Sequence, residues 1–144
     1  MPIIIDANRA GDFSNPCHGQ AEMIIKGISK RKVRVSLGGH LLRELVKTRL
    51  RDLIAEWNRI GIIHRIDDKD VDAEEKKFKA RGIKSDDPHI LALASLASCR
   101  LLYTDDLNLI SDFKDVAFIK PKGKVMRPST TTALAEALLR KFGG

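Results

Sequence analysis

The chain has 144 residues, of which 43% are hydrophobic and 31% are charged, so we expect one globular domain with its own hydrophobic core. No apolar run approaches the roughly 20 residues that a membrane-spanning helix needs, and an aromatic content of 5% argues against a base-stacking platform for nucleic acid. The formal net charge of +7 favours contact with polyanions, although a basic surface can also serve solubility alone.

The first half of the chain alternates short apolar runs with segments of helical periodicity. The apolar runs predict strands at residues 2–5, 33–37 and 62–66. The sequence Ser14-Asn15-Pro16 is typical of a helix start, and apolar positions extend that helix to residue 28. Apolar positions at steps of three and four residues predict one long amphipathic helix at 42–60, which Gly61 ends.

The second half continues this alternation. Helices are predicted at residues 67–82, 87–99, 107–113 and 133–142, and strands at residues 101–104 and 116–119. Six acids within residues 67–75 suit the positive end of a helix dipole, and we interpret them as a solvated helix start rather than a metal site. The basic segment 120–128 is interpreted as a linker, with Ser129 as cap of the last helix. The predicted domain therefore covers residues 1–120, and the linker and C-terminal helix cover residues 121–144.

The order of these elements predicts a three-layer α/β/α sandwich around a parallel sheet of about five strands. In such sheets ligands bind beyond the carboxyl ends of the strands. The residues that follow each predicted strand are therefore the first candidates for a functional site.

Four separate segments bring acidic residues to that edge of the predicted sheet. Asp6 follows the first strand, Glu44 lies in the first turns of the helix after the second, and Asp87 opens the helix before the fourth. Asp105 and Asp106 follow the fourth strand. Clustered carboxylates repel one another, and a divalent cation relieves the repulsion. Oxygen ligands of this kind suit Mg²⁺ or Mn²⁺, which can activate water and stabilise charge on a phosphoryl group during phosphodiester hydrolysis.

Each acid also has a simpler interpretation. Asp87 precedes Pro88 and can cap a helix, Glu44 can be one more charge on a solvated helix face, and Asp105 and Asp106 can be turn residues. Asp6 is harder to explain in this way, because it closes an apolar strand. The metal-site interpretation rests on the conjunction of all four segments.

Other side chains carry weaker signals. Arg9, Arg43 and Lys47 are candidates for binding RNA phosphate, or they balance the nearby acids. The four histidines show no metal-binding spacing, so we interpret them as structural or surface residues. Cys17 and Cys99 are isolated and no secretory signal is evident, which predicts reduced thiols in a cytoplasmic protein.

The acidic residues occur in an order that resembles the PIN-domain family. The matching segments are Asp6-Ala-Asn8, His40-Leu-Leu-Arg-Glu44-Leu, Asp87-Pro-His-Ile-Leu-Ala-Leu-Ala and Leu101-Leu-Tyr-Thr104-Asp-Asp106. The resemblance covers residues 1–120 and implies an endoribonuclease that uses Mg²⁺ or Mn²⁺. Many members are VapC-type toxins of toxin–antitoxin pairs, so it also implies an RNA substrate, a homodimer and a small antitoxin partner.

The resemblance also assigns roles to single residues. Four acids would be the catalytic metal ligands, namely Asp6, Glu44, Asp87 and Asp106. Asp105 is the rival of its neighbour for the fourth position. Asn8 and Thr104 would hold the ligands and waters in place.

Three rival functions differ in chemistry. A PIN-like module that binds RNA without cutting it is disfavoured, because all four acidic positions are occupied. A phosphatase of the HAD type expects Asp two residues after its nucleophile, where this chain has Asn8. A phospho-receiver needs an Asp after the third strand and a late Lys, which Asp67 and Lys120 match only loosely.

Overall fold

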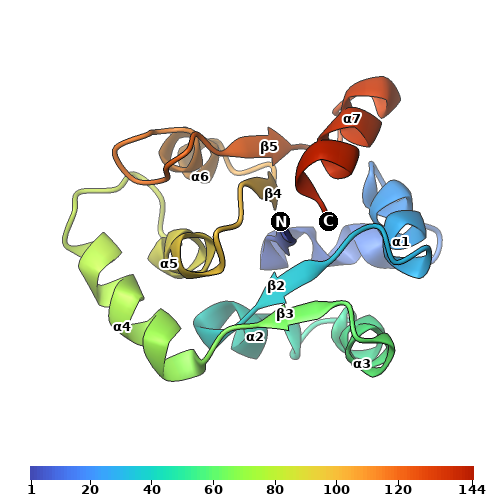
Figure 1. Ribbon diagram of the computed structural model, residues 1–144, viewed down its shortest axis with the longest axis horizontal. Coiled ribbons are helices and arrows are strands. Elements are labelled where there is room, and N and C mark those ends of the chain that lie inside the picture. The colour runs from blue at the N-terminus through green and yellow to red at the C-terminus, as the bar shows by residue number, and fades with distance from the viewer.

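A five-stranded parallel sheet forms the centre of the protein in a computed structural model that describes residues 1–144 (Figure 1). In sheet order, the strands are β3 (Ile63–Arg65), β2 (Val35–Leu37), β1 (Ile3–Ile5), β4 (Leu101–Tyr103) and β5 (Lys124–Met126). All four pairings between neighbours are parallel. The parallel sheet of five strands that the sequence predicts is therefore confirmed.

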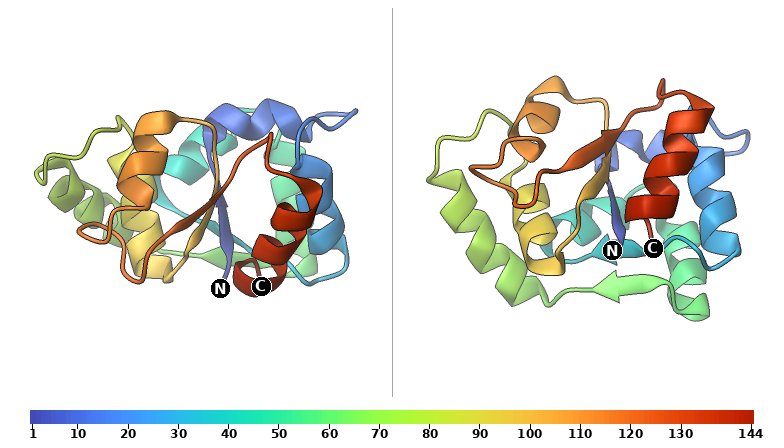
Figure 2. Two further views of the ribbon diagram at one scale, coloured as in Figure 1. Left: turned by 90° about the horizontal axis from the view of Figure 1, so that it is seen from above. Right: turned by 45° about the horizontal axis from the view of Figure 1, so that its top comes forward.

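Eight helices surround the sheet. They are the 3₁₀ helix η1 (Ala7–Phe13) and the α-helices α1 (Ala21–Ser29), α2 (Gly39–Leu45), α3 (Arg51–Ile60), α4 (Asp68–Lys79), α5 (Pro88–Ala97), α6 (Leu107–Phe113) and α7 (Thr132–Phe142). Helices α4, α5 and α6 lie on one side of the sheet and α1, α3 and α7 on the other, as the two views of Figure 2 also show. This arrangement confirms the three-layer α/β/α architecture.

The two central strands are buried on both faces. Every residue of β1 and β4 is fully buried, in runs of Ile, Leu and Tyr that suit a strand covered by helices on both sides. Burial of each such apolar side chain contributes about 1.5–3 kcal/mol to folding. The first candidate site residues lie at the carboxyl ends of these two buried strands.

The order of the strands reverses between β1 and β4. From β1 the chain continues outward to β2 and β3, whereas from β4 it continues in the opposite direction to β5. In open parallel sheets, such a reversal leaves a crevice outside the carboxyl ends of the strands, and ligands bind there. The topology therefore singles out the residues directly after β1 and β4.

The prediction of one long helix at 42–60 is wrong, because the chain forms two separate helices there, α2 and α3. Between them, the Thr48 hydroxyl donates to the Leu45 carbonyl at 2.6 Å and accepts from the Leu50 backbone N–H at 3.1 Å. A threonine that satisfies backbone groups in this way offers the chain an alternative to helical hydrogen bonds. The predicted end at Gly61 is confirmed, with a left-handed φ of 80°.

The fifth strand lies elsewhere than the sequence predicts. Residues 116–119 form a turn, in which the Asp115 carboxylate accepts from the Ala117 N–H at 2.8 Å and Val116 is exposed. The strand instead occurs in the segment interpreted as a linker, where Lys124 N donates to the Arg100 carbonyl at 2.7 Å. Its exposed lysine and single fully buried residue, Met126, are typical of an edge strand and gave no strong apolar signal.

Two helix starts also differ from prediction. Helix α1 begins at Ala21 rather than near Pro16, because the His18 N–H donates to the Asp12 carbonyl and closes a turn there. Thr131, not Ser129, caps α7 by accepting from the Leu134 N–H. Helix α7 contacts β4, β5 and α1, so the last residues belong to the packed fold.

Two further expectations concern cysteines and membranes. Cys17 and Cys99 are both free thiols, and burial raises the pKa of Cys99 to about 12. None of the helices has the length and apolar character required to cross a membrane.

Gly39 sets the start of α2, and we predict that its replacement is costly. It has a φ of 58°, and an added Cβ would lie 2.7 Å from Val71 Cγ1 on α4. Gly39→Ala should lower the free energy of unfolding by about 2–4 kcal/mol, from backbone strain and overpacking together. Urea unfolding followed by circular dichroism measures this loss. Gly61→Ala is the matched control, because Gly61 also has positive φ but open space around it. Equal losses in both variants would contradict the steric role of Val71.

Candidate metal centre

Asp6 is held in a buried position at the carboxyl end of β1. The residue is only 3% exposed. One carboxylate oxygen, Oδ1, accepts from the Asn8 backbone N–H at 3.1 Å, and Oδ2 accepts from the Thr104 hydroxyl at 2.7 Å. Thr104 directly follows β4, which pairs with β1 in register. The two central strands therefore fix the orientation of this carboxylate.

Thr104 links the acids that follow the two strands. It is fully buried, and while its hydroxyl donates to Asp6 it accepts from the Asp106 backbone N–H at 3.1 Å. The predicted holding role of Thr104 has this geometric support. Asn8 reaches Asp6 through its backbone N–H, and its side chain is exposed.

Asp106 and Asp105 differ in their surroundings. Asp106 caps α6, with Oδ1 accepting from the Asn108 and Leu109 N–H groups at 3.0 and 3.1 Å. Asp105 is exposed, and its carboxylate lies 2.6 Å from Arg127 Nε. Capping of a helix therefore accounts for one oxygen of Asp106, whereas an ion pair engages Asp105.

Asp87 lies among the other acids. Although it stands at the start of α5, its carboxylate makes no capping hydrogen bond, so the interpretation as a simple helix cap is wrong. Burial raises its pKa from 3.8 to about 6, and the negative charges of Asp6, Glu44, Asp106 and Asp86 add to that rise. These charges act on Asp87 because the fold brings their segments together.

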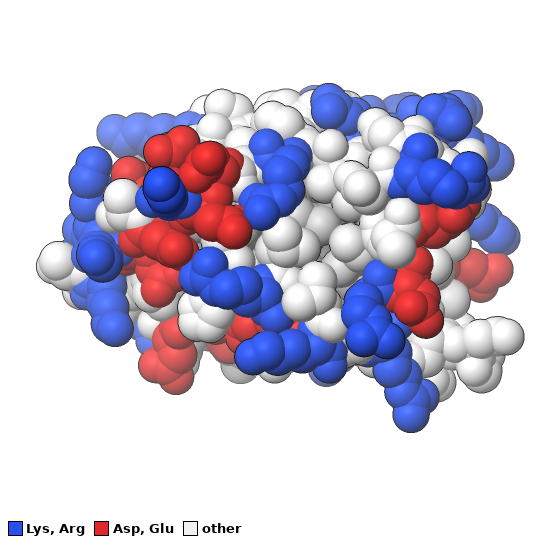
Figure 3. Space-filling view, turned by 90° about the horizontal axis from the view of Figure 1, so that it is seen from below, with Lys and Arg blue, Asp and Glu red and all other residues white.

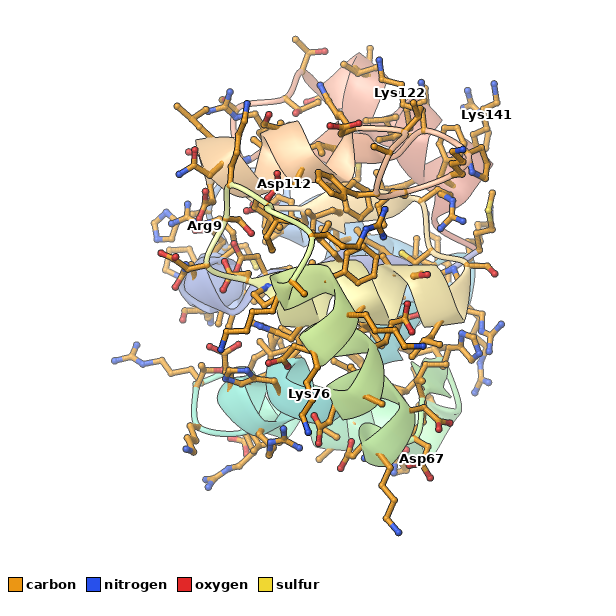
Figure 4. The ribbon with its side chains drawn as sticks, turned by 90° about the vertical axis from the view of Figure 1, so that its left-hand side faces the viewer. Arg9, Asp67, Lys76, Asp112, Lys122 and Lys141 are labelled. Atoms are coloured by element: carbon orange, nitrogen blue, oxygen red, sulfur yellow. The ribbon has the colours of Figure 1, made fainter.

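A buried carboxylate on α6 positions the loop that carries Asp87. Asp112 is 2% exposed and accepts from the backbone N–H groups of Lys84 and Ser85, and Figure 4 shows it beside this loop. The Ser85 hydroxyl in turn accepts from the Asp87 N–H at 3.1 Å. Nothing in the sequence pattern singled out Asp112, because its role depends on a contact between distant segments.

Glu44 stands between the acids and a pair of histidines. Its Oε1 lies 2.8 Å from His89 Nε2, without the alignment of a hydrogen bond. His89 is buried in α5, and burial lowers its pKa to about 4, helped by the nearby His40. The rings of His40 and His89 stand 4.3 Å apart between their centroids.

A second group of possible metal ligands was missed by the sequence analysis. His40, Glu75 and His89 come from α2, α4 and α5, and their ligating atoms all lie within 4.8 Å of one another. No fixed spacing joins them in the sequence, so no pattern could identify them as a group. The only signal was a histidine in the apolar run of α5, two residues after Asp87.

The acidic start of α4 is only partly a solvated surface. Figure 3 shows acidic side chains gathered over this helix, with lysines and arginines around them. Asp67, labelled in Figure 4, caps the helix by accepting from the Lys69 N–H at 2.8 Å. Asp68 accepts from the Gly39 N–H at 2.7 Å, and Asp72 pairs with an arginine of α2. These contacts tie α4 to α2.

The three cationic candidates are not equally free. Arg43 donates to Asp72 at 2.9 Å, which raises the arginine pKa, and Arg9 lies 3.6 Å from Asp12. Lys47 is exposed and has no carboxylate within 4.0 Å. Lys47 is therefore the most available of the three for an added anion.

Comparison with family models, curated proteins and solved structures gives no significant match.

We predict that removing the charge of Asp87 stabilises the protein. Since folding raises its pKa, the folded chain binds this proton more tightly than the unfolded chain does. The stability that protonated Asp87 contributes is therefore fully present below pH 3.8 and is lost as the pH rises through about 6. In EDTA at pH 7.5, Asp87→Asn should raise the free energy of unfolding by about 1–2 kcal/mol, with solvent screening taken into account.

Urea unfolding at pH 3.5 and pH 7.5 measures this effect, and the gain should disappear at the lower pH. Asp52→Asn is the control, because that side chain is 94% exposed and its change should stay within about 0.5 kcal/mol. An Asp87→Asn protein that is no more stable than the natural chain at pH 7.5 would refute the repulsion.

Proposed function

We propose that this chain is a metal-dependent endoribonuclease of the PIN kind, which hydrolyses RNA phosphodiester bonds as the toxin of a toxin–antitoxin pair. The observation that carries the proposal is the Thr104 hydroxyl that links Asp6 to Asp106, together with the pKa of Asp87, which burial raises and the charges of Asp6, Glu44 and Asp106 raise further. The charges of acids from four segments thus act together, and two of these acids, Asp6 and Asp106, come after the two strands between which the strand order reverses. The PIN-like order of the same residues supports the reaction class.

The donor set fits Mg²⁺ or Mn²⁺. Asp6, Glu44, Asp87 and Asp106 offer only carboxylate oxygens, which these ions prefer. Asp87 has no capping bond, and one oxygen of Asp106 lies outside the capping of α6, so both retain ligand capacity. When bound, a divalent cation offsets the negative charge of the phosphoryl group and makes water a stronger nucleophile.

The protein's own residues prepare this site. The Thr104 hydroxyl donates to the Asp6 carboxylate and accepts from the Asp106 backbone N–H, and Asp112 holds the loop before Asp87. The Asp6 carboxylate is therefore oriented before any ligand arrives, and the backbone segments that carry Asp106 and Asp87 are held in place. The net charge of +7 draws in RNA at long range, and exposed Lys47 is the best placed of the three candidates to contact phosphate.

A homodimer and a small antitoxin follow from the same proposal. An antitoxin that inhibits this enzyme would have to place cationic or metal-blocking groups against the four carboxylates. Co-purification of the chain with a small partner, followed by sizing of the complex, addresses both partners.

The proposal predicts RNA cleavage that requires both the metal and Asp6. Purified protein is incubated with total RNA in Mg²⁺, in Mn²⁺ and in EDTA, and the cut ends are mapped. Asp6→Asn should lower the cleavage rate at least about 100-fold, because a buried ligand is lost, while EDTA should abolish cleavage.

The adjacent aspartates provide matched variants. Asp106→Asn should also lower the rate about 10- to 100-fold, whereas Asp105→Asn, which loses only an exposed ion pair with Arg127, should stay within about threefold. RNA binding without cleavage by the folded chain would instead support the inactive RNA-binding module. Cleavage that survives in Asp6→Asn would contradict the metal role of that residue.

A further inference from the structure

We propose that His40, Glu75 and His89 form a second cation site, which binds a transition-metal ion such as Zn²⁺ or Co²⁺ beside the carboxylate site. The three residues come from α2, α4 and α5, which pack against one another. Their ligating atoms all lie within 4.8 Å of one another, so small side-chain movements would bring them to the ligand distances of about 2.0–2.2 Å that Zn²⁺ takes. The proposal does not depend on RNA cleavage.

The state of His89 gives an independent reason to expect a ligand. Its side chain is only 2% exposed, yet neither ring nitrogen has a hydrogen-bond partner. Nε2 approaches Glu44 Oε1 to 2.8 Å without aligning with it. A buried imidazole that lacks both bonds is unfavourable unless another group satisfies it, and a metal ion does so directly.

The donor set selects the class of metal. Two imidazole nitrogens and one carboxylate oxygen suit Zn²⁺ and its neighbours among the transition metals, whereas Mg²⁺ prefers oxygen alone. The second histidine, His40, is 46% exposed, and Glu75 already lies 3.7 Å from its Nδ1. An ion can therefore enter from the His40 side, with water completing its coordination.

Contacts between the helices hold these ligands in place. The Arg43–Asp72 ion pair and the hydrogen bond from Gly39 N–H to Asp68 join α2 to α4. Helix α4 packs along α5, which carries His89. The separation of the three ligands is thus set by helix packing rather than by a mobile loop.

Glu44 places the two sites in contact. It approaches His89 at 2.8 Å, and its charge also acts on Asp87. Metal at the histidines would therefore compete for, or reorient, a carboxylate of the neighbouring site. Binding itself, and not activity, is the property that tests the second site.

Co²⁺ titration followed by visible absorption tests the proposal in the full chain. Excess Mg²⁺ fills the carboxylate site, so that absorption reports an ion with nitrogen ligands. We expect one Co²⁺ per chain in the natural protein and in Asp6→Asn, and displacement of that ion by Zn²⁺. In His40→Ala and in Glu75→Gln, the affinity should fall at least about tenfold.

His18→Ala is the matched control, because His18 is also exposed but lies outside the group. Its Co²⁺ affinity should equal that of the natural chain. His40 and Glu75 are partly exposed, so both variants should fold, and circular dichroism confirms this. Absence of nitrogen-ligated Co²⁺ in the natural chain, or equal affinity in His40→Ala, would overturn the proposal. Asp6→Asn distinguishes the two sites, because this variant should lose RNA cleavage and still bind Co²⁺ at the histidine group.

Discussion

Parallel pairing of β1 with β4 brings Asp6 next to Thr104, and the Thr104 hydroxyl donates a 2.7 Å hydrogen bond to the Asp6 carboxylate. The remaining acids are arranged around this contact. Asp106 follows Thr104 along the chain and donates its backbone N–H to the same hydroxyl. The reversal of strand order between β1 and β4 leaves the space outside this pair open to the loop that carries Asp87.

The fold confines negative charges that repel one another. Asp87 is affected most, because burial and four neighbouring carboxylates together raise its pKa to about 6. This repulsion opposes folding, and carboxylates with perturbed pKa values of this kind are typical of functional sites. Asp112 and Ser85 hold the loop of Asp87 in spite of the repulsion. A divalent cation would relieve the same repulsion that the hydrogen bonds only resist.

Much of this arrangement could be predicted, and the exceptions have physical reasons. Strands β1 and β4 are fully buried, so their apolar runs are strong signals, and Asp6 stands out at the end of one. The edge strand β5 carries no such run, and the break between α2 and α3 depends on one hydroxyl, that of Thr48. The group of His40, Glu75 and His89 is invisible in sequence, because three helices must pack before the side chains meet. Local patterns therefore located the buried strands and the acids that follow them, whereas the histidine group depends on tertiary contacts.

We propose that the carboxylates around Asp6 and Asp87 form a binding site for a divalent cation. Titration with Mn²⁺, with the free ion counted by electron paramagnetic resonance, tests it most directly. The experiment uses His40→Ala protein, so that the histidine group contributes no binding. We expect that this protein binds Mn²⁺ and that adding Asp6→Asn weakens binding at least about tenfold. Equal Mn²⁺ affinity and stoichiometry with and without Asp6→Asn would contradict it.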